Sequence, residues 1–200
     1  MDVKEAIRKR ASVRRFRPDP VPDEMIHQML EAARLAPSGC NAQPWRFKVV
    51  TDRRIKLDLA KAAHRQNFIA KAPSVIVCCA DISGYIDRTV STMQDLGKIG
   101  EVADRIVSIT CANADEMRKM DSAQIGPVVA FNVAIAVEHM VLRAVELGLG
   151  TCWVKLLDEP LIKKIFGWDD NMHVVSLLAV GYPGMEPKQR EKLSMEDILL

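Results

Sequence analysis

Signatures of secretion and of membrane insertion are absent from this sequence. Its five cysteines are an odd number, and none belongs to a C-x-x-C pair. A disulfide framework is therefore not expected. We expect a reducing, cytoplasmic location instead. The opening residues MDVKEAIRKR contain no apolar stretch of the kind found in a secretory signal. The longest apolar stretch is interrupted by Asn132, Glu138 and Arg143, so no segment is predicted to span a membrane.

Several catalytic signatures are also missing. No G-x-S-x-G motif of a serine hydrolase is present, and no G-x-G-x-x-G links a strand to a helix as in dinucleotide-binding folds. The four histidines are far apart, with no H-x-x-x-H or Cys–His pair, so no metal site is predicted. The sequence has 28 basic and 26 acidic residues, and the resulting net charge of +2 predicts binding to neither nucleic acid nor a membrane.

What is present describes an ordinary globular chain. A length of 200 residues favours one domain spanning residues 1–200. A hydrophobic fraction of 48% and a charged fraction of 27% exclude intrinsic disorder. Helical and strand patterns intermix without strict alternation, which predicts an α+β fold with helices packed on a sheet.

Hydrophobic periodicity outlines the elements of this fold. Helices are predicted from Asp2 into the basic run after Ile7, from Pro22 to before Pro37, and over 52–63, 123–147 and 161–166. Strands are predicted over 47–50, 75–80, 151–154 and 174–180. Residues 75–80 lack polar alternation and should be buried on both faces. The helix over 123–147 is apolar almost all round, which indicates a core or a subunit interface. Residues 84–121 are polar and weakly periodic, and only partly helical structure is expected there.

A basic segment follows the first predicted helix. Arg10, Ser12 and Arg14 offer two guanidinium groups and a hydroxyl, which match the oxygens of a phosphate. A solvated basic face, or a nucleic-acid-binding segment over Arg8–Arg17, is compatible with the same run. The rest of the chain offers no matching basic face, which disfavours nucleic acid. Near the other end, Lys188 and Arg190 are two positions apart on an extended segment and point to one side, as an anion clamp or a solvated tail would.

Two further segments have the chemistry of a ring-binding site. Pro37–Trp45 holds a hydroxyl, two carboxamides and an indole between prolines, and carboxamides suit the edge of a heteroaromatic ring. A structured turn explains the same residues equally well. Cys40 lies in this segment either as a reactive thiol or, as favoured here, as a small packing residue. The glycines of Gly148–Lys155 allow close backbone approach to a flat ligand, or they end the preceding helix.

Together these segments resemble the nitroreductase family of FMN-dependent oxidoreductases. The resemblance rests on R-x-S-x-R-x-F at 10–16, P-S-G-x-N-x-Q-P-W at 37–45, G-L-G-T-C-W at 148–153, and V-G-Y-P followed by K-x-R over 180–190. It covers residues 1–80 and about 130–195, and residues 84–127 lie outside it. The fold it implies is a central mixed or antiparallel sheet flanked by helices, in an intertwined homodimer with FMN at the subunit interface.

The resemblance also implies an activity. NADH or NADPH would deliver hydride to flavin N5, and a small acceptor such as a nitroaromatic or a quinone would take it in a ping-pong reaction. No side chain is obligatory for catalysis, because the flavin carries the hydride. Other flavin chemistry of the superfamily, namely reductive dehalogenation, ene reduction or flavin fragmentation, is the alternative. The variable segment 84–127 is expected to cover the pocket and to set the acceptor.

Cofactor-binding residues follow from the matched motifs. They are Arg10, Ala11, Ser12, Arg14, Pro37, Ser38, Asn41, Gln43, Asn67, Trp153, Val154, Lys155, Lys188 and Arg190. Those at the two chain ends would hold the phosphate and ribityl chain, those over 37–43 would reach the flavin from the other subunit, and those over 153–155 would lie along the isoalloxazine. Asn67 would reach the pyrimidine edge of the ring.

Two positions depart from the family pattern. Ala11 stands where an arginine is frequent, and backbone contacts survive that change. Lys155 stands where a small residue is common. Its ammonium either points outward, the favoured interpretation, or stabilises the reduced flavin.

Overall fold

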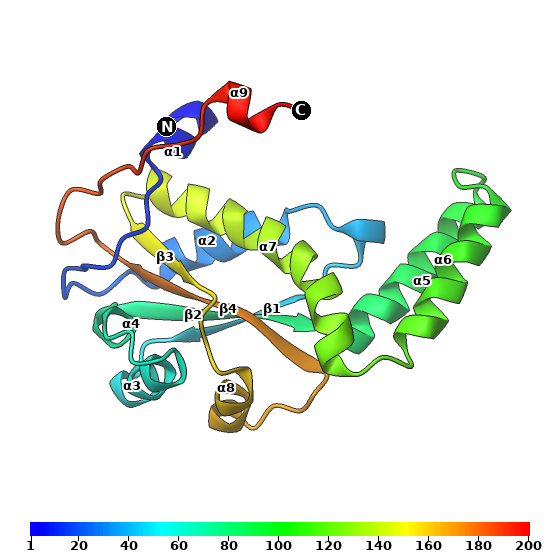
Figure 1. Ribbon diagram of the computed structural model, residues 1–200, viewed down its shortest axis with the longest axis horizontal. Coiled ribbons are helices and arrows are strands. Elements are labelled where there is room, and N and C mark those ends of the chain that lie inside the picture. Colours follow the sequence, from blue (N-terminus) through cyan, green and yellow to red (C-terminus); the bar gives the residue numbers. More distant parts are fainter.

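A four-stranded antiparallel sheet lies at the centre of the computed structural model, which describes residues 1–200. The strand order is β1-β2-β4-β3 (Figure 1). The strands are β1 (Trp45–Val50), β2 (Ser74–Asp81), β3 (Gly150–Val154) and β4 (Met172–Gly181). Each begins one or more residues earlier than its hydrophobic run predicts. The α+β class is confirmed, and of the two predicted kinds of sheet the antiparallel one is observed.

Helices cover both faces of this sheet and enclose two separate cores (Figure 1). On one face lie α2 (Asp23–Arg34) and α7 (Ser122–Glu146), and on the other lie α3 (Arg53–Ala62), α4 (Phe68–Lys71) and α8 (Glu159–Phe166). β2 sends Ile76 and Cys78 into the first core and Val75 and Val77 into the second. The prediction that this strand is buried on both faces is therefore confirmed.

The helix α7 dominates the first core. Asp121 caps its N-terminus through a reciprocal capping box with Gln124. The helix is long and apolar enough to cross a membrane by length and composition, but half of it is buried inside the fold, against α2 and the sheet. Its outer face leaves Val128 and Phe131 exposed. One side of α7 thus belongs to the core, and the other is free for a partner.

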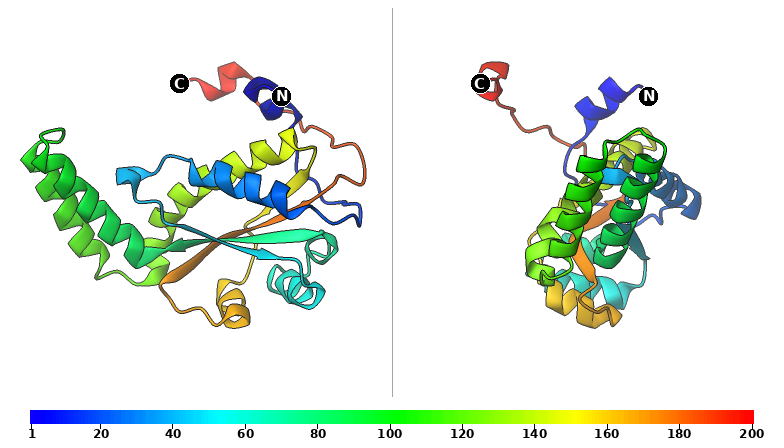
Figure 2. Two further views of the ribbon diagram at one scale, coloured as in Figure 1. Left: turned by 180° about the vertical axis from the view of Figure 1, so that it is seen from behind. Right: turned by 90° about the vertical axis from the view of Figure 1, so that its right-hand side faces the viewer.

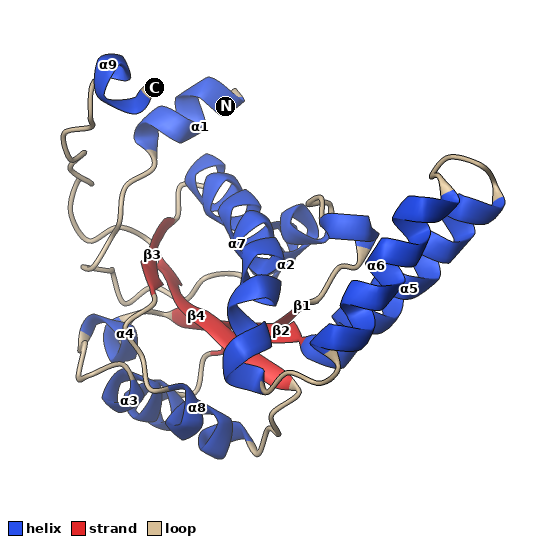
Figure 3. Ribbon diagram, turned by 45° about the vertical axis from the view of Figure 1, so that its right-hand side comes forward, coloured by secondary structure: helices blue, strands red, loops and turns tan.

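Residues 82–117 form a helical hairpin, which corrects the expectation of only partly helical structure. α5 (Ile82–Lys98) follows β2 without a loop and is capped by Asp81, and α6 (Asp104–Met117) runs back beside it. The hairpin projects from the sheet (Figure 3). Ala114 is the one fully buried residue of α6. Periodicity is weak in α6 because it buries so little apolar surface, whereas α5 buries a regular stripe of Ile82, Ile86, Thr89 and Met93 that the prediction missed.

The two ends of the chain lie beyond the same edge of the sheet, away from the hairpin. They carry α1 (Val3–Lys9) and α9 (Met195–Ile198) (Figure 2). Asp2 caps α1 as its sequence predicts, since its carboxylate accepts the Glu5 N–H at 2.7 Å. Beyond α1 the chain returns to β3 in an extended conformation, and this return segment builds one wall of the candidate site.

Candidate functional site

The segment after α1 is held against the sheet by backbone hydrogen bonds. Val13 N–H donates to the Thr151 carbonyl at 2.8 Å, and Arg17 N–H donates to the Tyr182 carbonyl at 2.9 Å. The absence of a side chain at Gly150 permits this approach, because a Cβ there would lie 2.6 Å from Cγ2 of Val13. The basic motif is therefore a fixed strip along β3 and the end of β4, and not a loose tail.

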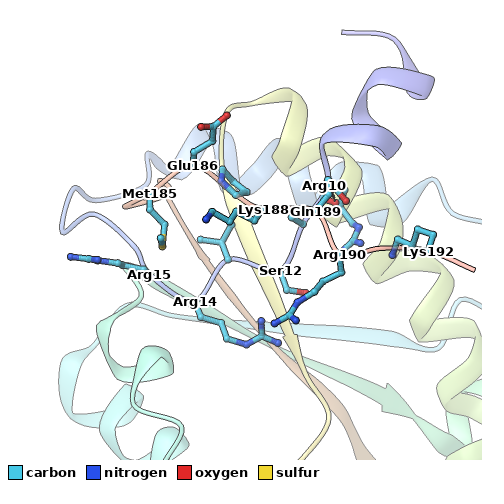
Figure 4. A pocket seen from close by; sticks show the side chains of 13 residues that line it. Arg10, Ser12, Arg14, Arg15, Met185, Glu186, Lys188, Gln189, Arg190 and Lys192 are labelled. Carbon is cyan, nitrogen blue, oxygen red and sulfur yellow. Dashed lines mark hydrogen bonds between the residues drawn. The ribbon is translucent and has the colours of Figure 1, made fainter.

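The C-terminal segment closes over this strip. Gly184 N–H donates to the Arg15 carbonyl at 2.7 Å. The Gln189 side-chain amide donates to the carbonyls of Arg8 and Arg10, each at 2.7 Å. Residues from opposite ends of the sequence thereby enclose a cavity of about 880 Å³ (Figure 4). Its wall consists of Arg10, Ala11, Ser12, Val13, Arg14, Arg15, Met185, Glu186, Pro187, Lys188, Gln189, Arg190 and Lys192.

This basic cavity concentrates positive charge. Six basic side chains and one acidic one form its wall, a surplus of five charges in a chain whose net charge is only +2. None of the six makes an ion pair with an acid of the chain, although fifteen ion pairs exist elsewhere. Unpaired cations facing one hollow repel one another, so the wall is suited to an anion of high charge.

The sequence prediction for the phosphate end of the site can now be compared with the structure. Arg10, Ala11, Ser12, Arg14, Lys188 and Arg190 all line the one cavity. Sequence reasoning did not select Arg15, Lys192 or Gln189, which share that wall. Their sequence positions beside the selected basic residues could have identified them. Arg15 and Lys192 add charge, and Gln189 fixes the backbone.

The loop Pro37–Trp45 has an unusual backbone. Cys40, Asn41 and Gln43 adopt left-handed conformations with φ of 50°, 50° and 47°. A residue other than glycine in this conformation destabilises the backbone by of order 1 kcal/mol or more, and such strain is concentrated at functional sites. The carboxamides of Asn41 and Gln43 meet at 3.1 Å. Two of the predicted flavin contacts therefore form one polar edge on a tightly defined loop.

A mostly apolar groove of about 410 Å³ adjoins this loop. Pro37, Ser38 and Gly39 form one side of it. The other side comes from α5 and α7, through Tyr85, Val128, Phe131, Asn132 and Ile135. Burial raises the pKa of the nearby Cys40 thiol, which therefore stays protonated at neutral pH. This agrees with a packing role for Cys40 and not with a reactive thiolate.

The loop Pro37–Trp45 and the basic cavity lie in different parts of the folded chain. The loop follows the end of α2 that faces the α5–α6 hairpin, whereas the cavity lies beyond β3, near the chain ends (Figures 1 and 4). No residue lines both the groove and the cavity. A single chain therefore does not bring Pro37, Ser38, Asn41 and Gln43 to the phosphate-binding residues.

The remaining predicted contacts lie outside the cavity wall. Val154 is buried in the core opposite α7, so only its backbone can reach a ligand. Trp153 is half-buried and packs toward the first core. Lys155 is exposed, and its Nζ donates to the Val175 carbonyl at 3.1 Å. Asn67 is exposed where α4 begins, with no side-chain capping bond.

Comparison with known sequences finds one matching family model and several similar proteins. The model of the nitroreductase family matches residues 7–182. An NADH dehydrogenase of Thermus thermophilus is 30% identical over 203 residues, which cover 100% of this chain and 96% of that protein. An iodotyrosine deiodinase of Thermotoga neapolitana is 26% identical over 183 residues, covering 92% and 89% of the two chains.

Solved structures agree on the fold. A protein of Exiguobacterium sibiricum, described as a nitroreductase and crystallised in complex with FMN, superposes with a TM-score of 0.78. The match covers 100% of this chain and 96% of that chain, at 23% identity. At that identity the likeness establishes the architecture, and the role of each side chain has to be argued from the site itself.

Proposed function

The chain belongs to the nitroreductase family, and on that premise we propose that it is an FMN-dependent oxidoreductase that uses NADH or NADPH to reduce a small acceptor. Bound FMN supplies the redox chemistry by accepting and donating hydride at N5. The protein binds and orients the cofactor, and none of its side chains has to act as a nucleophile. Nitroaromatics and quinones are the acceptors we expect first.

The basic cavity is the observation that carries this proposal. A phosphomonoester has nearly two negative charges at neutral pH and needs several cationic partners. The cavity supplies a surplus of five positive charges, none of them paired within the chain. Arg10, Ser12 and Arg14 from one end of the chain, with Lys188 and Arg190 from the other, would hold the phosphate, and the backbone at Ala11 would follow the ribityl chain.

We further propose that two copies of the chain complete each site. The separation of the loop Pro37–Trp45 from the basic cavity supports this, because no residue of the loop lines the cavity within one chain. The exposed Val128 and Phe131 on α7 offer apolar surface for the second copy. In the dimer, the loop of one subunit would contact a flavin whose phosphate the other subunit holds. Trp153, Val154, Lys155 and Asn67 are proposed to lie along that ring.

The α5–α6 hairpin is proposed to select the acceptor. Its Tyr85 lines the groove opposite Pro37–Gly39, together with Val128 and Phe131 of α7. No charged side chain lines this groove. An uncharged aromatic acceptor fits such a lining better than a charged one, because desolvating a charge there has no compensation.

Anaerobic reduction tests the activity. The protein loaded with FMN should lose the flavin absorption band when NADH or NADPH is added. A screen of nitroaromatics, quinones and halogenated phenols should then restore it at rates that identify the acceptor class. No bleaching with either nicotinamide would overturn the oxidoreductase assignment. Fast turnover of halogenated phenols alone would instead favour reductive dehalogenation, the activity in the name of the Thermotoga relative.

Sedimentation tests the shared site. The FMN-loaded protein should sediment as a dimer with two flavins per dimer. A monomer that binds FMN with full affinity would overturn the two-copy arrangement but not the activity.

A further inference from the structure

The strained loop Pro37–Trp45 is fixed by residues far away in the sequence. Three of its residues other than glycine have a left-handed backbone conformation, which persists only where surrounding contacts stabilise it. One contact is local, since Gln43 N–H donates to Ser38 Oγ at 3.0 Å. The sheet adds two more, since Arg46 donates to the Gln43 carbonyl at 3.4 Å and Asp81 N–H donates to the Pro44 carbonyl at 2.9 Å. Helices add a contact from Asn132 on α7 and one from Arg88 on α5.

Asn132 is a buried polar residue on an otherwise apolar helix. It is 5% exposed, and its Oδ1 accepts the Gly39 N–H at 2.8 Å across 93 residues of sequence. Burying a carboxamide is unfavourable unless it is hydrogen-bonded, so an apolar residue would serve packing better at this position. What Asn132 adds is the acceptor that holds the start of the loop.

Arg88 holds the other end of the loop. Its Nε donates to the Ala42 carbonyl, and its Nη2 lies 3.6 Å from Oδ2 of Asp81. Asp81 in turn accepts hydrogen bonds from Gly84 N–H at 2.9 Å and from Arg46 at 2.6 Å. Ala42 is thereby tied to the junction between β2 and α5.

The space for this network depends on Gly84. A Cβ at position 84 would lie 2.2 Å from Oδ2 of Asp81 and 2.7 Å from Nη2 of Arg88. Hydrogen bonds and the nearby arginines outweigh the effect of burial and hold the pKa of Asp81 below its ordinary value. The carboxylate is therefore ionised at neutral pH and attracts the Arg88 guanidinium, although Nη2 makes no hydrogen bond.

We propose that Asn132 and Arg88 are positioning residues that keep the loop Pro37–Trp45 in the conformation that receives the flavin ring, and that Arg88 couples this loop to the α5–α6 hairpin. Neither residue touches the basic cavity. The inference rests on the proposed FMN function for its ligand. Its structural part, that these two side chains rigidify the loop, stands without the ligand.

Hydrogen exchange on the protein without FMN tests the structural part. Asn132→Leu keeps the number and branching of the side-chain heavy atoms, raises the helix propensity and removes the acceptor. Exchange at residues 39–43 should rise about tenfold, while exchange within β2 stays unchanged. Ser176→Ala is the matched control, because Ser176 is also buried and its Oγ has no hydrogen-bond partner. Unchanged loop exchange in Asn132→Leu would overturn the role of Asn132.

A pair of hairpin arginines tests the coupling. Arg88→Met removes the contact to Ala42, whereas Arg118→Met removes an ion pair within the hairpin, to Asp87 at 2.7 Å. Arg88→Met should accelerate exchange in the loop and raise the acceptor KM more than it lowers kcat. Arg118→Met should do neither. Equal effects of the two variants would show that Arg88 acts only through hairpin stability and would overturn the coupling.

FMN affinity completes the test. Asn132→Leu and Arg88→Met should each raise the FMN dissociation constant about tenfold, a change of about 1.4 kcal/mol. The inhibition constant of inorganic phosphate, which probes the basic cavity, should stay within twofold. If the wild-type protein binds no FMN, the proposed function fails, and the exchange result still decides the structural part. If it binds FMN and the variants bind equally well, the positioning role fails.

Discussion

Two clusters of charged side chains in this protein follow opposite rules. In the basic cavity, six cations line one hollow without an ion pair. Between α8 and the start of β4, a cluster of charged side chains is paired. Glu159 accepts from Val174 N–H at 3.0 Å, and its Oε1 lies 3.0 Å from His173 Nδ1 and 3.2 Å from Lys163 Nζ. Lys163 also reaches Asp170 at 3.2 Å.

The difference separates binding from stability. Paired charges around Glu159 lower the energy of the folded chain whether or not a ligand is present. Unpaired cations in the cavity repel one another, and only a bound anion relieves this repulsion. Their charge therefore increases the affinity for an anionic ligand and not the stability of the free protein. Charge removal should therefore weaken FMN binding at the first cluster and folding at the second.

The largest effect is expected in the cavity. Arg14→Gln combined with Lys188→Gln should weaken FMN binding about 100-fold, because each charged hydrogen bond contributes about 1.5 kcal/mol. The melting temperature should stay equal or rise, since repulsion is relieved. Riboflavin, which lacks the phosphate, should bind both proteins equally. Fluorescence titration with the two ligands measures the affinities, and thermal unfolding measures the melting temperature.

Salt provides the control for the cavity. FMN affinity of the wild-type protein should fall between 0.05 and about 0.5 M salt, as ions screen the cavity, and the double variant should show a weaker dependence. Arg34→Gln removes a cation paired with Glu31 and should leave FMN binding unchanged. Equal loss of FMN and riboflavin affinity in the double variant would show that the cavity does not bind the phosphate.

The second effect is on folding. Burial raises the pKa of Glu159, but hydrogen bonds from His173 and Val174, the charge of His173 and a hydrogen bond from Lys163 outweigh burial and lower the pKa to about 2. Glu159→Gln should reduce the free energy of unfolding at pH 7 by about 2 kcal/mol, because it leaves the buried Lys163 with only the exposed Asp170 as an anionic partner. FMN affinity should not change.

The pH dependence of this effect has a definite sign. A carboxylate with a lowered pKa stabilises the fold above its unfolded pKa, 4.5, and the contribution disappears as the pH falls toward about 2. The difference between wild type and Glu159→Gln should therefore shrink from pH 5 to pH 2 in urea titrations. Asp58→Asn, at an exposed pair with Lys61, is the control and should cost well under 1 kcal/mol. A constant difference over that range would contradict the pairing.

A third substitution tests the backbone that carries the cavity. Gly150→Ala places a Cβ against Val13, with the nearest side-chain atom at 2.6 Å. The strip bearing Ser12 and Arg14 should shift, with a loss of about 1 kcal/mol in stability and a several-fold loss of FMN affinity. Adding Val13→Ala should restore both, because it removes the clash. Failure of the second change to rescue the first would show that the strip is not held by this contact.

Much of the fold was predictable because its elements carry strong local signals. β2 is an unbroken apolar run and α7 a long apolar helix, and both were located to within two residues. The hairpin α5–α6 was not. α6 buries a single side chain, so its apolar stripe is faint, and the clearer stripe of α5 was overlooked. The antiparallel order β1-β2-β4-β3 depends on contacts between distant segments, which no single run encodes.

The candidate site divides in the same way. Arg10, Arg14, Lys188 and Arg190 were identifiable as an anion clamp by residue type, and the structure brings them together in one cavity. Asn132 was visible only as an interruption of an apolar helix, and its bond to Gly39 spans 93 residues. Arg88 lies in a segment without a readable motif. Residues that act by holding another segment show their role only in the folded chain.

The smallest effect concerns a cation that belongs to neither cluster. Lys155 is exposed, and its Nζ donates to the Val175 carbonyl at 3.1 Å. If this contact persists in the loaded protein, Lys155→Met should shift the flavin midpoint potential by less than about 30 mV, which corresponds to about 1.4 kcal/mol for two electrons. Spectroelectrochemical titration measures that potential, and Lys48→Met on the exposed side of β1 serves as control. A shift to lower potential well beyond this bound, absent in the control, would show that the ammonium turns to the flavin and stabilises its reduced form, against the outward orientation favoured here.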